Sequence, residues 1–213
     1  MRWGVLMFVV ACGQRTPGVV APPPKHAQAP PDAAAPPVAA ANGLRGPADF
    51  ASIADRAERS RALFGELAVV LEHPRCVNCH TPDDSPRQGD QHAIHDPPIA
   101  RGAGDRGAVG MQCTGCHQDR NLELARVPGA PNWHLAPMSM VWLDRTPAQI
   151  CVQLKDTARN GNRTLAQVHD HIAHDGLVAW GWAPGADRVP PPGTQELAAS
   201  LAQAWIDSGA ACP

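Results

Sequence analysis

A short motif of two cysteines and one histidine occurs twice and constrains this chain more than any other feature. Residues 76–80 read CVNCH, and residues 113–117 read CTGCH. The chain has seven cysteines among its 213 residues, and these two motifs contain four of them. Cysteines three positions apart lie about one helical turn apart, so both thiols of a motif can reach one bound group.

The spacing C-x-x-C-H is the attachment signature of c-type haem. Two thiols one turn apart can bond to the two vinyl groups on one edge of a porphyrin, and the histidine that follows can bind the iron. The repeat therefore predicts two covalently attached haems. The predicted cofactor-binding residues are Cys76, Cys79, His80, Cys113, Cys116 and His117.

Three other readings of a paired-cysteine motif fit less well. A zinc site of the C-x2-C…C-x2-C kind has about 15–20 residues between its pairs, whereas 33 residues separate Cys79 from Cys113. A thioredoxin-like redox site needs a βαβ context, which the sequence does not indicate. Structural disulfides within the motifs remain a further alternative.

The N-terminus has the pattern of an export signal. Arg2 supplies a positive charge, a short apolar run follows, and residues 9–12 read VVAC. This stretch resembles the bacterial lipobox, and the resemblance implies a signal peptide at residues 1–11 and lipid attachment at Cys12. The alternative is a plain secretory signal. The apolar run is too short to span a bilayer, and both readings place the mature protein outside the cytoplasm.

Residues 12–47 are dominated by proline and alanine. Such a segment cannot bury enough apolar surface to fold, and its prolines favour an extended chain. We interpret it as a tether that holds a domain, residues 48–213, away from a membrane. A proline-rich ligand for another protein is the alternative interpretation.

The domain is predicted to be mainly α with long irregular loops. Apolar periodicity and helix-start residues predict helices near residues 47–71, 147–157, 165–174 and 194–208. Residues 81–145 are rich in Gly, Pro and Asp, and we expect mostly loop there. With few aromatic residues, the chain is expected to need a large apolar group as part of its core.

Each iron needs a sixth ligand or an open position. The leading candidates are His95, in a loop between the motifs, His171, on a predicted helix, and His134, in a loop that also contains Trp133. Binding of one iron by two histidines is favoured for at least one haem. A His/Met pair that uses Met138 or Met140 is the alternative. We expect tryptophans to line the haem sites: Trp133, Trp142, Trp180 and Trp182.

Cys151 and Cys212 are the remaining cysteines. In an oxidising compartment two such cysteines are expected to form a disulfide. Two separate free thiols are the alternative.

The motifs resemble those of bacterial multihaem c-type cytochromes. Four further stretches are similar to a small family of exported dihaem-like proteins that carry the label isoquinoline 1-oxidoreductase subunit: residues 73–102, 127–142, 177–185 and 204–213. The resemblance covers roughly residues 50–213 and implies a cytochrome c-like dihaem domain packed around two covalent haems. Nothing in the chain resembles the domains that would oxidise isoquinoline, so that label implies an electron-accepting subunit or partner.

The function expected from these features is periplasmic electron transfer by a membrane-tethered dihaem cytochrome. Its partners would be a redox protein, such as a dehydrogenase, and the membrane through a lipid anchor. A dihaem peroxidase-like enzyme and a haem-based sensor or binding module are the alternatives. The net charge of −2 does not indicate a nucleic-acid partner. With only two lysines in the chain, docking through a broad lysine ring is not expected.

Overall fold

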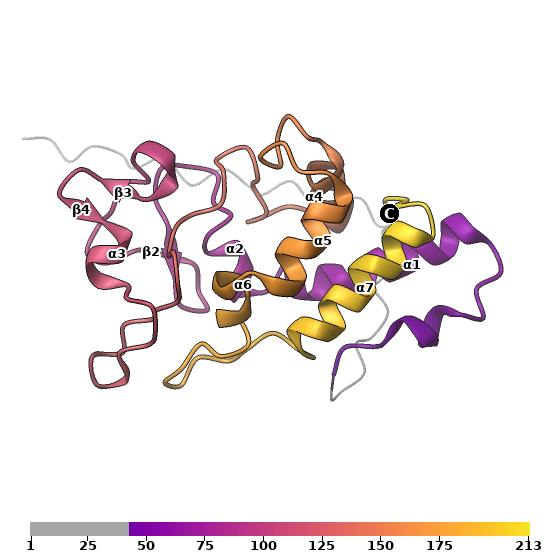
Figure 1. Ribbon diagram of the computed structural model, residues 1–213, viewed down its shortest axis with the longest axis horizontal. Helices are drawn as coiled ribbons and strands as arrows, with labels where there is room; N and C mark the ends of the chain where they lie inside the picture. Colours follow the sequence, from indigo (N-terminus) through magenta and orange to yellow (C-terminus); the bar gives the residue numbers. More distant parts are fainter. Residues whose placement is uncertain (1–42) are drawn as a thin grey trace, which may run out of the picture. The chain divides into compact units, whose positions relative to one another are not determined.

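The computed structural model describes residues 43–213, and this part of the chain is mainly helical with long irregular connections (Figure 1). The prediction of a mainly α fold with long loops is thus confirmed. The predicted signal peptide, most of the tether and the lipidation site Cys12 lie outside the described residues.

Helices and short 3-10 turns make up most of the regular structure. The helices are α1 (Arg56–Leu71), α2 (Pro74–Val77), α3 (Cys113–Cys116), α4 (Pro147–Lys155), α5 (Leu165–His174), α6 (Gly176–Trp180) and α7 (Gln195–Asp207). The 3-10 turns are η1 (Pro47–Phe50), η2 (Ala103–Asp105) and η3 (Glu123–Ala125).

Four two-residue strands form two small antiparallel hairpins in the long loop region. Strand β1 (Arg87–Gln88) pairs with β2 (Ala93–Ile94), with Arg87 opposite Ile94. Strand β3 (Gly107–Ala108) pairs with β4 (Met111–Gln112), with Gly107 opposite Gln112. These hairpins hold the loops that carry the second motif and His95.

The predicted helix boundaries are confirmed for α4, α5 and α7 to within about two residues. The single helix predicted over residues 47–71 is wrong, because the structure divides it into η1 and α1. The cause is Asp55, whose carboxylate accepts a hydrogen bond from the Glu58 N–H at 2.7 Å and so starts a new helix at Arg56. Helix α6 was not predicted.

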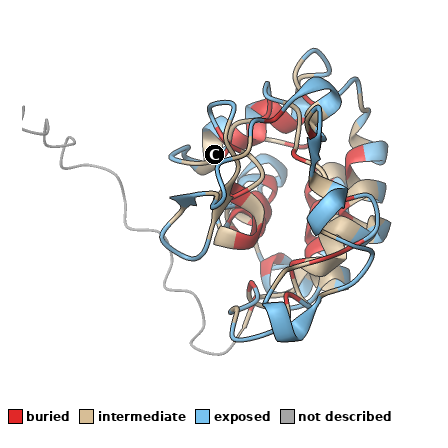
Figure 2. Ribbon diagram, turned by 90° about the vertical axis from the view of Figure 1, so that its left-hand side faces the viewer, coloured by how far each residue is buried: buried red, intermediate tan, exposed pale blue. Residues whose placement is uncertain are grey.

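The core is built mainly between α1 and α7, which lie side by side in Figure 1. Buried positions concentrate along the helices, whereas the loops are mostly exposed or half-buried (Figure 2). Phe64 of α1 packs against Trp205 of α7 with ring centroids 5.0 Å apart. Helices α4 and α5 add Ile150, Leu154 and Val168 to the same cluster.

The helical part of the core is formed mainly by aliphatic and aromatic side chains of α1 and α7. The two long helices lie against each other along their apolar faces. The long loop region is different, since it contributes few residues to that cluster.

The ordered structure begins before residue 48. Leu44 is buried, and the backbone N–H of Arg45 donates to the Glu66 carboxylate at 2.8 Å. Residues 43–47 therefore pack on α1, at the end of the segment assigned to the tether. Between residues 43 and 213, no helix has both the length and the apolar character that a membrane span needs.

Candidate functional site

The first motif is held on α2 and the turn after it. His73 precedes this helix, and its Nδ1 accepts a hydrogen bond from the Arg75 N–H at 3.2 Å, so the imidazole acts as the N-cap. Pro74 occupies the first helical position, as its fixed φ favours. The Cys79 N–H donates to the Cys76 carbonyl at 3.2 Å, which places the two cysteines one turn apart.

The second motif forms α3, and the β3–β4 hairpin leads into it. The His117 N–H donates to the Cys113 carbonyl at 2.9 Å and closes the turn. Gly107, in the hairpin, has a φ of +92°, and a Cβ there would lie 2.5 Å from the Met111 carbonyl oxygen. Only glycine fits at this position, so it sets the path of the chain into the second motif.

The four motif cysteines are free thiols: Cys76, Cys79, Cys113 and Cys116. Burial, followed by the neighbouring Cys79, raises the pKa of Cys76 to about 12. Burial likewise raises the pKa of Cys79 to about 11. A redox-active CxxC pair needs a thiolate of lowered pKa, so the first motif does not have the electrostatics of a thioredoxin-like site.

His80 is fixed in one tautomer. Its Nδ1 lies 3.0 Å from the Met140 carbonyl oxygen, which can only accept, so Nδ1 carries the proton. Burial lowers the pKa of His80 to about 3, and His171 and Arg101 contribute in the same direction. The imidazole is therefore neutral, and its Nε2 has a free lone pair. Its ring is stacked on Trp142, with centroids 3.4 Å apart and planes at 3°.

His117 repeats this arrangement in the second motif. Its Nδ1 lies 2.7 Å from the Pro128 carbonyl oxygen, and its ring is stacked on Trp133 at 4.4 Å. Burial lowers the pKa of His117, and His95 lowers it further. Trp180 packs edge-on against Trp133 at 4.9 Å. In both motifs, then, a tryptophan covers one face of a neutral imidazole.

Two of the three predicted additional ligands lie near a motif histidine. The rings of His95 and His117 have centroids 5.9 Å apart, and the His95 Nδ1 lies 2.9 Å from the Pro97 carbonyl oxygen. His171, on α5, is near enough to His80 to lower its pKa, and its own Nδ1 lies 3.4 Å from the Asp175 carboxylate. Each motif histidine thus has a second histidine as a neighbour.

The structure does not group His134 with either motif histidine. Its Nδ1 lies 2.5 Å from the carbonyl oxygen of Asn132 in its own loop, and its ring is not among those that pack on His80 or His117. Met140 contributes its carbonyl oxygen to His80, while its side chain packs in the core. Met138 is half-exposed.

The two motifs lie close to each other although 33 residues separate Cys79 from Cys113 in the chain. The Cys113 thiol is near enough to Cys79 to raise the pKa of that thiol. Even so, the four cysteines and their histidines do not converge on one point. Within residues 43–213, no three His, Cys, Asp or Glu side chains are arranged to hold a metal ion. The arrangement required for the zinc alternative is absent from this part of the chain.

Arg101 and Asp175 were not identified from the sequence. Arg101 is buried beside the first motif, and no local pattern in the sequence pointed to it. Asp175 follows His171 by four positions, a spacing that brings side chains together on a helix, so this contact was open to prediction. Two shallow surface hollows lie away from the motifs, one between α5 and α7 and the other along α4.

Comparison with known proteins adds no relative. No family model matches the chain, and neither the curated proteins nor the solved structures include a significant match.

Proposed function

We propose that this chain is a dihaem c-type cytochrome that carries single electrons between partners. The observation that carries the proposal is that each motif histidine has a second histidine near it: the His117 and His95 rings have centroids 5.9 Å apart, and His171 is near enough to His80 to help lower its pKa. Such pairs are what two six-coordinate irons require.

The spacing of one pair supports this assignment. Histidine nitrogens bind metals at about 2 Å, so two imidazoles on opposite sides of one iron have centroids about 6 Å apart. The His95 and His117 centroids are 5.9 Å apart. Their ring planes lie at 70°, and rings on opposite sides of an iron can adopt any such rotation about the shared axis.

The chemistry of the donors also fits haem. In c-type attachment, Cys76 and Cys79 would bond to one porphyrin and Cys113 and Cys116 to the other, and all four thiols are free. A metal-bound histidine needs an unprotonated nitrogen and a partner for the other one. His80, His95 and His117 each direct Nδ1 to a backbone carbonyl and keep Nε2 free.

Bound haem iron supplies a one-electron redox couple. The chain's own residues hold and shield that group. Carbonyl oxygens fix the imidazoles in one orientation, and Trp142 and Trp133 cover their faces and exclude water. The Cys79 and Cys113 thiols are near enough to interact electrostatically, so the two porphyrins would be neighbours, which suits transfer between them.

The same pairing disfavours the peroxidase-like and sensor alternatives. Both need an iron with an exchangeable position, and a second histidine beside each motif histidine would fill it. We further propose that the carrier is exported and tethered to a membrane, with a redox protein as its partner. The Cys151–Cys212 disulfide gives this location weak support, because disulfides persist in oxidising compartments.

The test is the haem content and ligation of the full chain produced with a functional haem-attachment system. A pyridine haemochrome assay is expected to give two covalent haems per chain, and carbon monoxide is expected to leave the reduced spectrum unchanged. His95→Ala should create one carbon-monoxide-binding iron, whereas the matched change His134→Ala should not. Zero haem would refute the proposal. Carbon monoxide binding by the wild type would instead favour the peroxidase-like enzyme.

A further inference from the structure

We infer that the two haem sites are unequal, that the first site is reduced in preference to the second, and that Arg101 is the side chain that sets this order. The inference rests on the proposed function. It adds a direction: electrons enter at the exposed second site and reside at the buried first site.

The two motifs differ in how they join the core. Val77 of the first motif is buried in the main hydrophobic cluster, Cys76 packs against it, and Met140 and Trp142 beside His80 are members of the same cluster. No residue of the second motif belongs to that cluster. Thr114, Gly115 and Cys116 are exposed. The first site therefore has the drier, less polarisable surroundings.

A buried cation stands beside the first site. Arg101 is 4 % exposed, and its charge partly offsets the rise in the pKa of the Cys79 thiol and adds to the lowering of the His80 pKa. Its guanidinium donates to the Thr81 hydroxyl at 3.1 Å, and Thr81 directly follows His80. It also donates to the Ala136 carbonyl, in the segment that leads to Met140.

The charge of Arg101 is only partly compensated. One Nη atom donates to the Asp105 carboxylate at 2.8 Å, and that carboxylate is 27 % exposed and thus screened by water. The other acceptors are neutral, including the Asp83 carbonyl at 3.3 Å. The exposed Asp83 carboxylate, whose pKa Arg101 helps to lower, is paired with Arg87. The Nε atom is buried without any hydrogen-bond partner in the described structure. Net positive charge therefore remains in a region of low dielectric.

A second buried arginine adjoins the first motif. Arg75 is 8 % exposed, precedes Cys76 and forms an ion pair with Asp90, whose side chain is half-exposed. Beside the second motif the cations are Arg106, which is exposed to solvent and donates to the Asn132 side chain, and the half-buried Arg188, which helps to lower the pKa of His117. Water and salt screen a charge in the position of Arg106 far more strongly.

The sign of the effect follows from electrostatics. Reduction lowers the charge of an iron by one, so a fixed positive charge nearby favours the reduced state. Low solvent exposure acts in the same direction, because the more highly charged oxidised state loses hydration. Burial and Arg101 thus both raise the reduction potential of the first site, whereas the second site is more exposed and its neighbouring cations are less buried.

The test is spectroelectrochemistry on holoprotein whose two haems have first been verified. The wild type is expected to show two separate one-electron waves. Arg101→Gln should move the higher wave downward by about 59 mV or more, which is a tenfold change in the ratio of reduced to oxidised haem. It should leave the lower wave in place. Arg101→Lys should restore most of the shift, since it keeps the charge.

Two variants separate charge from structural damage. Asp105→Asn removes the carboxylate beside Arg101 and should move the higher wave upward, opposite to Arg101→Gln. Arg106→Gln is the matched change at the second motif. At 0.15 M salt it should change the ratio of reduced to oxidised haem less than twofold for either wave.

The inference would be overturned if both haems titrated at one potential, if Arg101→Gln shifted the lower wave, or if Arg101→Gln and Arg101→Lys had equal effects. In each of these cases two bound haems would still support the proposed function. Absence of haem would instead remove the proposed function itself.

Discussion

At the scale of single residues, hydrogen bonding decides what each histidine can do. A carbonyl oxygen that accepts from Nδ1 leaves Nε2 as a lone-pair donor, and His80, His95 and His117 share this arrangement. His73 is the opposite case. Its Nδ1 is itself the acceptor, for the Arg75 N–H, so this imidazole must stay unprotonated at Nδ1 to cap α2.

His73 should make stability depend on pH. Burial, followed by Arg75, lowers its pKa to about 4 from an ordinary value of 6.5. As pH falls below 6.5, the unfolded chain binds a proton first, so this contribution to stability is full above 6.5 and declines toward pH 4. His73→Asn keeps a capping side chain that does not titrate in this range. Urea midpoints at pH 7.5 and 5 should differ less in the variant, and an unchanged difference would contradict the assignment.

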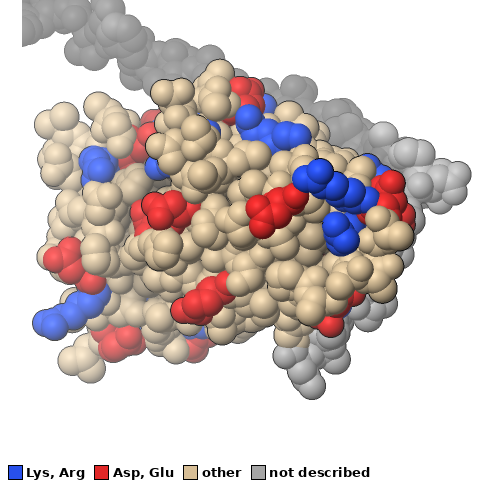
Figure 3. Space-filling view, turned by 45° about the vertical axis from the view of Figure 1, so that its right-hand side comes forward, with Lys and Arg blue, Asp and Glu red and all other residues tan. Residues whose placement is uncertain are grey.

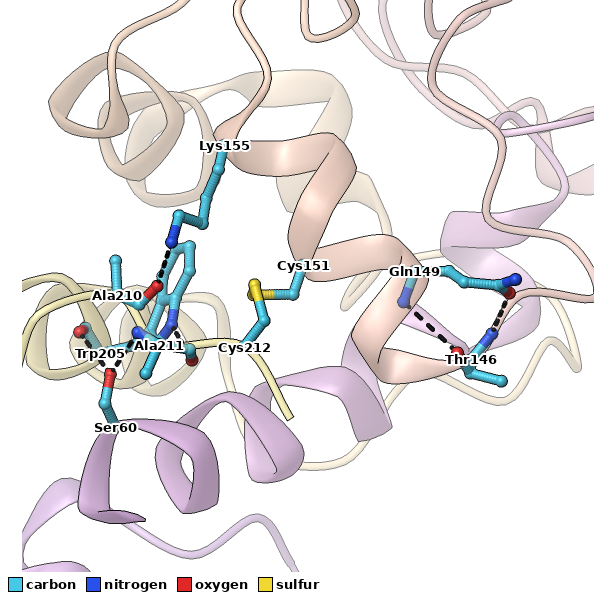
Figure 4. Close-up of a disulfide and its surroundings, with 9 residues drawn as sticks. All are labelled: Ser60, Thr146, Gln149, Cys151, Lys155, Trp205, Ala210, Ala211 and Cys212. Carbon is cyan, nitrogen blue, oxygen red and sulfur yellow. Dashed lines mark hydrogen bonds between the residues drawn. A yellow bond between two sulfur atoms is a disulfide. The ribbon is translucent and has the colours of Figure 1, made fainter. Parts of the chain in front are cut away.

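At the scale of elements, side-chain caps set where helices begin. Thr146 and Gln149 form a reciprocal pair at the start of α4, shown in Figure 4: the Thr146 hydroxyl accepts from the Gln149 N–H at 3.3 Å, and the Gln149 side chain accepts from the Thr146 N–H at 3.0 Å. Thr164 and Gln167 repeat the pattern at α5. Such local signals explain why both starts were predictable.

Thr146→Ala should lower the free energy of unfolding by about 1 kcal/mol, because the first turn of α4 loses one hydrogen-bond acceptor. Thr146→Ser keeps the hydroxyl and is expected to stay close to the wild type. The measurement is urea unfolding of both variants followed by circular dichroism. Equal stability of the alanine variant and the wild type would show that solvent replaces the cap at no cost.

At the scale of the whole molecule, the C-terminal segment links three helices. Cys212 forms a disulfide with Cys151 of α4, with Cα atoms 5.6 Å apart, which confirms the predicted pairing (Figure 4). The Lys155 ammonium donates to the Ala210 carbonyl at 2.7 Å, and the Ala211 N–H donates to the Ser60 hydroxyl of α1 at 2.9 Å. These contacts join α4 and α1 to the end of α7.

Removal of the disulfide by Cys151→Ala/Cys212→Ala should lower the free energy of unfolding by about 4 kcal/mol. The estimate comes from the chain entropy of the loop, which the sequence separation of 61 residues defines. Denaturant unfolding of the holoprotein tests it. Covalent haem content should not change, because neither cysteine belongs to a motif. A loss below about 1 kcal/mol would mean that the other C-terminal contacts suffice.

The charged surface matters at the same scale. On the face shown in Figure 3, acidic and basic side chains are interspersed rather than gathered into one field. The chain's near-neutral charge agrees with this view. Long-range steering by a single-sign field is therefore not a feature of this face, and a partner that meets it would depend on shape and short-range contacts.

The sequence by itself determined what depends on neighbouring residues: the two C-x-x-C-H turns and the caps of α4 and α5. The Cys151–Cys212 pair is not local, and only the count of remaining cysteines indicated it. The start of α1 is also set locally, by the Asp55 cap. Tertiary structure alone decided that His95 lies by His117, that His171 lies by His80, and that Arg101 stands buried at the first site. The reason is physical: a turn or cap is set by a few adjacent dihedral angles, whereas these pairs depend on how long loops fold back over a core.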